Sequence, residues 1–462
     1  MTTVTELDLA ARVLEWVRVL GGPGTEAEVL VERRALALTR FANSYIHQNM
    51  ADSTTTVRLR LHRDGRTALG STTLTVTDAL KDLVEHTVAA SRLTPADPGW
   101  PGLTPPSPVD YAGVVDDDIV AATPADRAGR VRAFVDAAGG LPTAGFCSTR
   151  YLTAAFANSA GQVAQGATTE VSMDGIARTA GADGVARLAG PRLSDVDGGV
   201  LGSRAAAKAL AGADPVELPS GRYEVVLEPT AVGDILLSLA LYGFNGKAVN
   251  ERRSFVEVGR DQFDAQVTLV DDPTAAYQVG LRFDLEGTPK HPLTLVGAGR
   301  TEAVPHDRRT AKVAGTQSTG HAIPGGTTWG ALPTNLILTP APGDPAHEID
   351  GPAADSSVLA LVRQVGRGLL VTDHWYTRVL DPRTLVMTGL TRNGVWLIEN
   401  GEIVRPVRNL RFTQSYPQAL APGQVLGVGT HAVPGISGWE EACYAAPALR
   451  LAAWNFTGGA SG

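Results

Sequence analysis

The most site-like group of polar residues in the sequence is the run Ser318-Thr-Gly-His321. Glycine lets another main chain approach closely, while Ser, Thr and His side chains supply hydrogen-bond donors and acceptors. Such a run can bind the backbone of an extended ligand, and it can equally be a tight structural turn. No Gly-x-Ser-x-Gly elbow precedes a helix here, so a nucleophile is not expected. The candidate substrate-binding residues are therefore Ser318, Thr319, Gly320 and His321.

The nine histidines are scattered through the sequence, whereas metal ligation by histidine usually depends on close spacing. No two stand four or five residues apart, which excludes a His pair on one helix face. A site assembled in space from His306-Asp307, His347-Glu348 and Asp373-His374 stays open, because ligands need not be neighbours in sequence. Isolated histidines are more often surface or structural groups, so we predict no metal ion and no other cofactor.

The two cysteines, Cys147 and Cys443, stand far apart and can form neither a disulfide framework nor a Cys-x-x-Cys site. Packing as small apolar residues is the simpler interpretation. Catalysis by either thiol would need an adjacent base and an electropositive setting, which the sequence does not reveal.

Composition narrows the class of protein further. A net charge of −8 and a pI near 5.6 argue against nucleic-acid and anionic-membrane partners. The first residues lack the basic start and apolar run typical of a signal peptide, and the sequence shows no apolar run of membrane-spanning length. It also shows no Gly-x-Gly-x-x-Gly or Walker pattern for a nucleotide. We therefore expect a cytoplasmic protein.

Hydrophobic periodicity predicts alternating helices and antiparallel strands in the first half, an α+β pattern. A proline-rich stretch, 94–108, reads as an extended surface connection. The predicted helices are 5–20, 77–92, 123–138 and an alanine-rich helix near 204–211. The predicted strands are 28–39, 57–61, 68–75, 143–151, 154–158 and 163–173.

Breaks at Asp214-Pro215 and 218–221 suggest a domain boundary, giving an N-terminal α+β domain, 1–215, and a mostly antiparallel-β domain, 216–462. The second domain should hold one strongly apolar helix, 230–242, and many short strands. The predicted strands include 267–269, 336–339, 368–372, 385–388 and 395–399.

Five segments spread over both halves resemble the TldD/PmbA (TldE) family in sequence and in order. They are Thr39-Arg-Phe-Ala-Asn-Ser-Tyr-Ile-His-Gln-Asn49, Asp271-Asp-Pro, Phe283-Asp-Leu-Glu-Gly-Thr-Pro289, Gly315-Thr-Gln-Ser-Thr-Gly-His-Ala322 and Thr388-Gly-Leu-Thr-Arg-Asn-Gly-Val-Trp-Leu-Ile-Glu-Asn-Gly-Glu-Ile403. The resemblance covers nearly the whole chain.

Zinc-binding members of that family carry His-Glu-x-x-x-His on the helix that here reads Ile-Leu-Leu-Ser-Leu-Ala-Leu-Tyr-Gly over 235–243. Laid on this chain, the motif falls on Ser238, Leu239 and Gly243, none of which supplies a zinc donor. Cys443 lies in the region where TldD-like members supply a thiolate ligand. The chain therefore resembles the PmbA/TldE branch.

The resemblance implies a subunit that pairs with a zinc-bearing TldD-like chain, or with a second copy of itself, to make a peptidase for small or unfolded peptides. Catalytic residues and metal would then lie on the partner, and this chain would wall the substrate chamber. Two alternatives stay open. One is a stand-alone enzyme of specialised metabolism, hydrolysing an amide or catalysing another reaction without zinc, and the other is a peptide-binding module.

Overall fold

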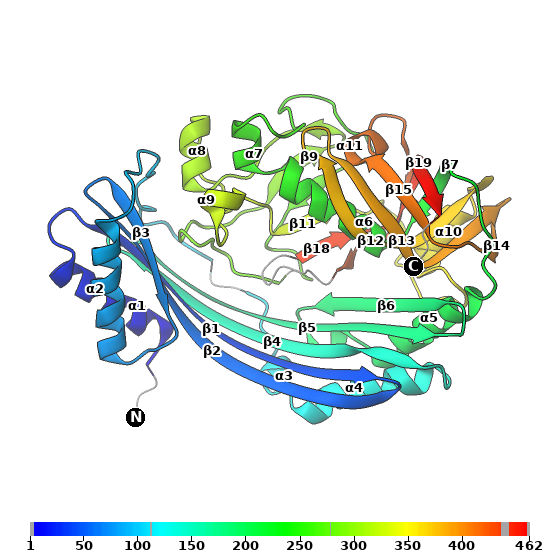
Figure 1. The fold of residues 1–462 in the computed structure, drawn as a ribbon, viewed down its shortest axis with the longest axis horizontal. Helices are drawn as coiled ribbons and strands as arrows, with labels where there is room; N and C mark the ends of the chain where they lie inside the picture. The colour runs from blue at the N-terminus through cyan, green and yellow to red at the C-terminus, as the bar shows by residue number, and fades with distance from the viewer. Residues whose placement is uncertain (1–3, 111–112, 278, 436–442, 460–462) are drawn as a thin grey trace.

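The computed structural model describes residues 4–110, 113–277, 279–435 and 443–459, and the predicted α+β class is confirmed. Three six- or seven-stranded sheets carry the fold, the first from the N-terminal half and the other two from the C-terminal half. In Figure 1 the first sheet arches along one side of the molecule, and the C-terminal half lies over it. The division into domains at residues 215 and 216 stays a prediction.

The first sheet is antiparallel, with the strand order β3-β2-β1-β4-β5-β6. Its strands are longer than the alternation predicted, because 143–158 continues without a break and Asn43-Ser44 closes the first hairpin with two positive φ angles. The last strand, β6, lies where no strand is predicted from the sequence. The bounds are β1 Glu26–Ala42, β2 Tyr45–Arg63, β3 Arg66–Thr72, β4 Thr143–Asn158, β5 Val163–Arg178 and β6 Asp183–Gly190.

Helices pack on both ends of this sheet (Figure 1). Helices α1 and α4 begin at capping boxes, Thr5 with Asp8 and Thr123 with Asp126. Helix α2 begins at Thr77, and the preceding residue, Val76, makes no side-chain cap. The bounds are α1 Glu6–Leu20, α2 Thr77–Ser91, α3 Asp117–Val120, α4 Pro124–Ala137, η1 Leu193–Asp195 and α5 Gly198–Ala211.

Two further sheets, with the orders β10-β9-β8-β11-β18-β17 and β12-β7-β19-β15-β13-β14, form most of the C-terminal half. Two pairings are parallel, β7 with β12 and β11 with β18. The strands are β7 Gly221–Leu227, β8 Leu269–Asp271, β9 Leu293–Gly297, β10 Arg300–Thr301, β11 Asn335–Leu338, β12 Arg367–Asp381, β13 Val386–Glu399, β14 Glu402–Pro406, β15 Leu410–Ser415, β16 Val425–Val428, β17 Val433–Pro434, β18 Cys443–Ala446 and β19 Leu449–Gly459.

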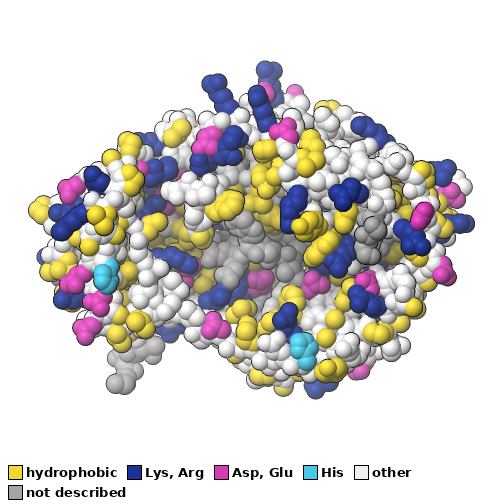
Figure 2. Space-filling model, viewed as in Figure 1, with side chains coloured by type: hydrophobic (Ala, Val, Ile, Leu, Met, Phe, Trp, Pro, Cys, Tyr) yellow, Lys and Arg dark blue, Asp and Glu magenta, His cyan; other side chains and the backbone are white. Residues whose placement is uncertain are grey.

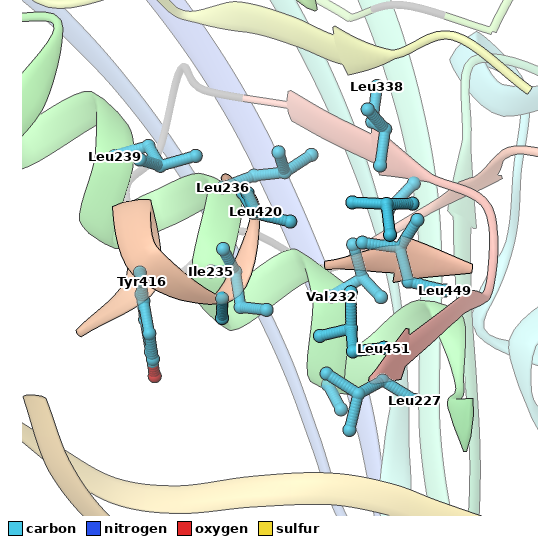
Figure 3. Packing of buried hydrophobic residues seen from close by; sticks show 14 of the residues in the cluster. Leu227, Val232, Ile235, Leu236, Leu239, Leu338, Tyr416, Leu420, Leu449 and Leu451 are labelled. Atoms are coloured by element: carbon cyan, nitrogen blue, oxygen red, sulfur yellow. The ribbon is translucent and has the colours of Figure 1, made fainter. Parts of the chain in front are cut away.

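The predicted apolar helix is present as α6 Pro229–Ser238, continued by a π-helical turn, η2 Leu239–Gly243. Figure 3 shows its side chains, including Val232 and Ile235, packed among leucines of the surrounding strands. Short helices decorate the rest of this half. They are α7 Gly246–Asn250, α8 Arg308–Ala314, α9 Gly326–Trp329, α10 Ser356–Val362 and α11 Tyr416–Ala419. Among the described residues, no helix is long and apolar enough to cross a membrane.

The proline-rich stretch is extended, as predicted, but it ties the two halves together instead of lying free on the surface. Asp97 forms an ion pair with Arg309 at 2.7 Å, and Thr104 donates to the carbonyl of Glu286 at 2.6 Å. Leu103 and Thr104 are buried. Proline rings prevent this segment from forming a helix or a central strand, so its main chain can follow the junction between the two halves.

Candidate functional site

A cavity of about 330 Å³ lies between the face of the first sheet and loops of the C-terminal half. Figure 2 shows this face of the molecule hollowed between the two halves, with basic and acidic side chains around the hollow. The strands β1, β2 and β4 supply one wall through Leu30, Arg58, Arg150 and Leu152. The loops supply the other wall through Gly280, Leu281, Phe283, Asp284, Leu285, Lys290, Gly320, His321, Ala322, Ile323, Pro324, Thr334 and Asn335.

Of the four residues singled out from the sequence, two hold the turn and two line the cavity. Ser318 and Thr319 hold the turn, since both hydroxyls bond to the carbonyl of His306 at 3.1 Å. Gly320 has φ +76°, and a Cβ there would lie 2.7 Å from the carbonyl oxygen of Pro289. Only Gly320 and His321 of the four line the cavity. Substrate binding by this turn stays a prediction.

His321 belongs to a buried series of hydrogen-bonded polar side chains. Its Nδ1 lies 2.9 Å from Thr319 Oγ1, and its Nε2 lies 3.2 Å from Asp271 Oδ1. Both the His321 and Asp271 side chains are fully buried. Burial alone would raise the pKa of Asp271, but the charges of His321 and Lys290 and a hydrogen bond from the Asn335 main chain lower it to about 2. Asp271 therefore stays an anion that orients the imidazole.

Lys290 and Asn335 join this series of side chains to the cavity. The Lys290 ammonium donates to Asn335 Oδ1 at 3.0 Å and to Thr334 Oγ1. The main-chain N–H of Asn335 donates to Asp271 Oδ2 at 2.7 Å. The amide and hydroxyl at the start of β11 thus meet the ammonium of Lys290 at one corner of the cavity.

Asp284 is the acidic side chain of the lining, and it faces its own loop. Its oxygens accept main-chain hydrogen bonds from Ala322, Glu286 and Thr288, each at 2.9 Å. Burial, with the nearby charge of Glu286, raises the pKa of Asp284 to about 7 despite these bonds. The carboxyl group shapes the 283–289 loop and carries only part of a charge near neutral pH.

Behind this loop lies a charged cluster that crosses the junction of the two halves. Arg60 of β2 contacts Glu28 of β1 at 2.6 Å and Glu286 of the loop at 2.9 Å. The second oxygen of Glu286 accepts from the main chain of Arg308 at 2.9 Å. Burial raises the pKa of Glu28 to about 7, although Arg60 opposes the shift. One guanidinium therefore joins two buried carboxyl groups from different halves.

The helix that would hold a zinc motif is packed in the apolar core. Leu239 is fully buried there, and Ser238 is 5% exposed. A Cβ at Gly243 would lie 2.8 Å from the ring of Phe255, so no histidine fits without moving that ring. These three positions hold no group that binds a metal.

The scattered histidine-acid pairs do not assemble into one site among the described residues, where no group of three His, Cys, Asp or Glu could hold a metal ion. His306 lies beside the 318–321 turn, whereas His347 is exposed and His374 is buried against Trp454. Burial raises the pKa of Cys147 to about 11 and that of Cys443 to about 12, so both thiols stay protonated.

Sequence reasoning missed the groups that give the cavity its charge. Asp271 and Asp284 stand in two segments that carried the family resemblance, but nothing in their spacing assigned them to one site. Lys290, Arg58 and Arg150 gave no local signal, because they meet only when the sheet and the loops come together.

Comparison with known proteins decides the family. The model for the PmbA/TldA metallopeptidase C-terminal domain matches residues 220–458, and the model for domain 1 of the same metallopeptidases matches residues 27–91. The chain belongs to this family. The resemblance to TldD/PmbA proteins is thereby confirmed, whereas the assignment to one branch rests on the residues of α6 and η2. No curated protein matches the sequence.

Solved structures share the fold of this PmbA/TldD-family chain over nearly its whole length. TldE from Thermococcus kodakarensis is 17% identical with a TM-score of 0.83, covering 97% of this chain and 100% of that one. A candidate modulator of DNA gyrase from Bacteroides thetaiotaomicron is 18% identical with a TM-score of 0.82, covering 99% and 100%. Another from Thermotoga maritima is 16% identical with a TM-score of 0.80, covering 97% and 99%.

Proposed function

We propose that this chain is the TldE-like subunit of a two-subunit peptidase, in which a TldD-like chain carries the zinc and this chain walls the substrate chamber. One observation carries the proposal: in a metallopeptidase-family fold, the helix expected to hold the metal is closed by Leu239 and by the contact of Gly243 with Phe255. A peptide carbonyl needs a Lewis acid or an equivalent oxyanion site to be hydrolysed. The partner supplies it.

The cavity at the junction supports a role in holding substrate. Its volume of about 330 Å³ suits a short segment of chain, and its walls combine leucines with a few polar groups. In this proposal the first sheet and the 320–324 segment form one side of a chamber for small or unfolded peptides in the cytoplasm. The zinc site of the partner faces that chamber.

Reconstitution tests the proposal. The chain is purified alone and mixed with a protein from the same genome that carries His-Glu-x-x-x-His, and hydrolysis of casein-derived peptides is followed by mass spectrometry. We expect a stable complex and turnover only in the mixture, lost with a chelator. Turnover by this chain alone after chelation, or no complex with any such protein, would overturn the proposal.

A second candidate function, a stand-alone amide hydrolase without zinc, is favoured by the Thr319–His321–Asp271 chain beside the cavity. An imidazole held by a carboxylate is the usual form of a general base. In the isolated protein this function requires turnover that depends on His321. The buried His321 side chain and the turn-forming contacts of Thr319 make the first proposal the better supported.

Substitution of His321 separates the two functions. For His321→Asn in the reconstituted complex we expect KM to rise about tenfold with kcat nearly unchanged, because the turn shifts while the metal chemistry stays on the partner. The exposed His347→Ala is the matched control and should alter neither constant. A kcat reduced a hundredfold or more by His321→Asn, in protein that keeps its unfolding temperature, would support the zinc-independent enzyme instead.

A further inference from the structure

One buried cation at the cavity wall, Lys290, makes its hydrogen bonds within the described part of the chain to neutral groups. Lys290 is 9% exposed, and its ammonium bonds to Asn335 Oδ1 at 3.0 Å and to Thr334 Oγ1. Among the described residues no carboxylate oxygen lies within 4.0 Å of it. An ammonium has three N–H donors, so one remains after these two acceptors.

The other charges of the cavity have closer partners. Arg58 pairs with Glu32, and Arg150 pairs with Glu170 at 2.7 Å. Asp271 interacts with Lys290 through its charge without a direct ion pair, and its oxygens contact His321 and the main chain of Asn335. The lining carboxyl group of Asp284 accepts three main-chain hydrogen bonds. Burying a charge is favourable only when the charge is paired or fully hydrogen-bonded. An anion that accepts a hydrogen bond from the third N–H of Lys290 would therefore be stabilised at this place.

The walls around Lys290 are largely apolar. Leu281, Phe283 and Leu285 line the cavity from the loop, and Leu30 and Leu152 line it from the sheet. An anion that fits must therefore carry a hydrocarbon group, since an isolated inorganic anion would leave this surface in contact with water. The size of the cavity suits the end of a short peptide segment whose last side chain is large and apolar.

We propose that the cavity captures the free C-terminal carboxylate of a peptide whose last side chain is apolar, with Lys290 as the anchor of the carboxylate. This inference rests on the proposed role in peptide hydrolysis and names the substrate class. It makes the chamber sensitive to the end of the chain: short peptides with a free carboxyl end are held, while an amidated or internal segment loses the ion pair. A desolvated lysine–carboxylate hydrogen bond should favour the free acid over the amide by about tenfold or more in affinity.

Binding of two matched peptides tests the proposal without any substitution. Isothermal titration compares acetyl-Ala-Ala-Leu as the free acid and as the C-terminal amide, with the wild-type chain. We expect the free acid to bind at least about tenfold tighter. Equal affinities, or tighter binding of the amide, would overturn it, and so would equally tight binding of acetate alone.

Substitution of the anchor gives the second test. Lys290→Met keeps an unbranched side chain that is one atom shorter, and it should remove the preference for the free acid. Lys81→Met is the matched control, because Lys81 lies on α2 and pairs with Glu85 on the same helix. A preference that survives Lys290→Met contradicts the assignment of the anchor. Should Lys290→Met unfold, the wild-type comparison of acid with amide decides alone.

The two proposals fail separately. Complex formation with the zinc-bearing partner is measured by analytical ultracentrifugation without any peptide. A complex that forms while acid and amide bind equally overturns only the carboxylate site. Discrimination between the peptides without a complex overturns the two-subunit peptidase and leaves the carboxylate site standing.

Discussion

Arg60→Met should destabilise the protein by about 3 kcal/mol at a pH near 8, because it leaves Glu28 and Glu286 buried without their shared cation. Both side chains are almost fully buried, at 6% and 4% exposed, while that of Arg60 is 21% exposed. Removing one partner of a buried ion pair typically costs about 3–5 kcal/mol, and the partial exposure of Arg60 places the change at the low end.

The penalty should shrink as the solution becomes more acidic. The pKa of Glu28 is raised from its ordinary value of 4.5 to about 7 in the folded protein. Between these two pH values the folded protein keeps a proton on Glu28 that the unfolded chain has released. The contribution of this group to stability is therefore present at low pH and is lost as the pH rises through about 7. At low pH Glu28 is protonated in the Arg60→Met variant, so one fewer buried anion lacks a cation and the destabilisation is smaller.

Chemical denaturation followed by tryptophan fluorescence, at pH values of about 5.5 and 8, measures both effects. Arg63→Met is the matched control on the same strand, because Arg63 pairs with the exposed Asp64 and its loss should change stability little. A loss for Arg60→Met that is no larger than that of the control, or that grows on acidification, would contradict the assigned role of this cluster.

Restoring the family's zinc motif by Ser238→His, Leu239→Glu and Gly243→His should unfold the protein instead of creating a metal site. Leu239→Glu would bury a carboxyl group in the apolar core, and Gly243→His would force the Phe255 ring to move. Each change alone should lower the free energy of unfolding by about 3 kcal/mol or more. The three together would remove most of the free energy of unfolding of a typical domain.

Thermal unfolding of the single variants and the solubility of the triple variant test this expectation. Gly233→Ala is the matched control in the same helix: a Cβ there meets no atom within 4 Å, so the change should be neutral or stabilising. A folded triple variant that binds zinc would mean that the core around α6 and η2 adapts, and the closed helix would no longer support a non-metal subunit.

Local sequence patterns predicted the elements well where the signal is local. The helices 5–20 and 230–242 have apolar faces, and 123–138 begins with a capping threonine followed by proline. The structure has all three within a few residues. Strand lengths were underestimated: 386–388 and 395–399 both belong to β13, because the residues between them also pair with β12. Pairing across a sheet overrides such local breaks.

The cavity could be predicted only in part. Glycine, hydroxyl and imidazole groups in one short run drew attention to 318–321, and Gly320 and His321 do reach the wall. The charges came from β2, β4 and the 290 region, which are distant in sequence and meet only through the packing of the two halves. No periodicity or motif encodes such a long-range encounter.

The zinc content of the untagged chain, measured by elemental mass spectrometry after purification alone and again after reconstitution with a TldD-like partner, tests the central claim most directly. The account predicts almost no zinc in the isolated chain and about one zinc ion per reconstituted pair. One zinc ion per isolated chain would contradict it, because a metal site would then exist in this subunit without the helix motif.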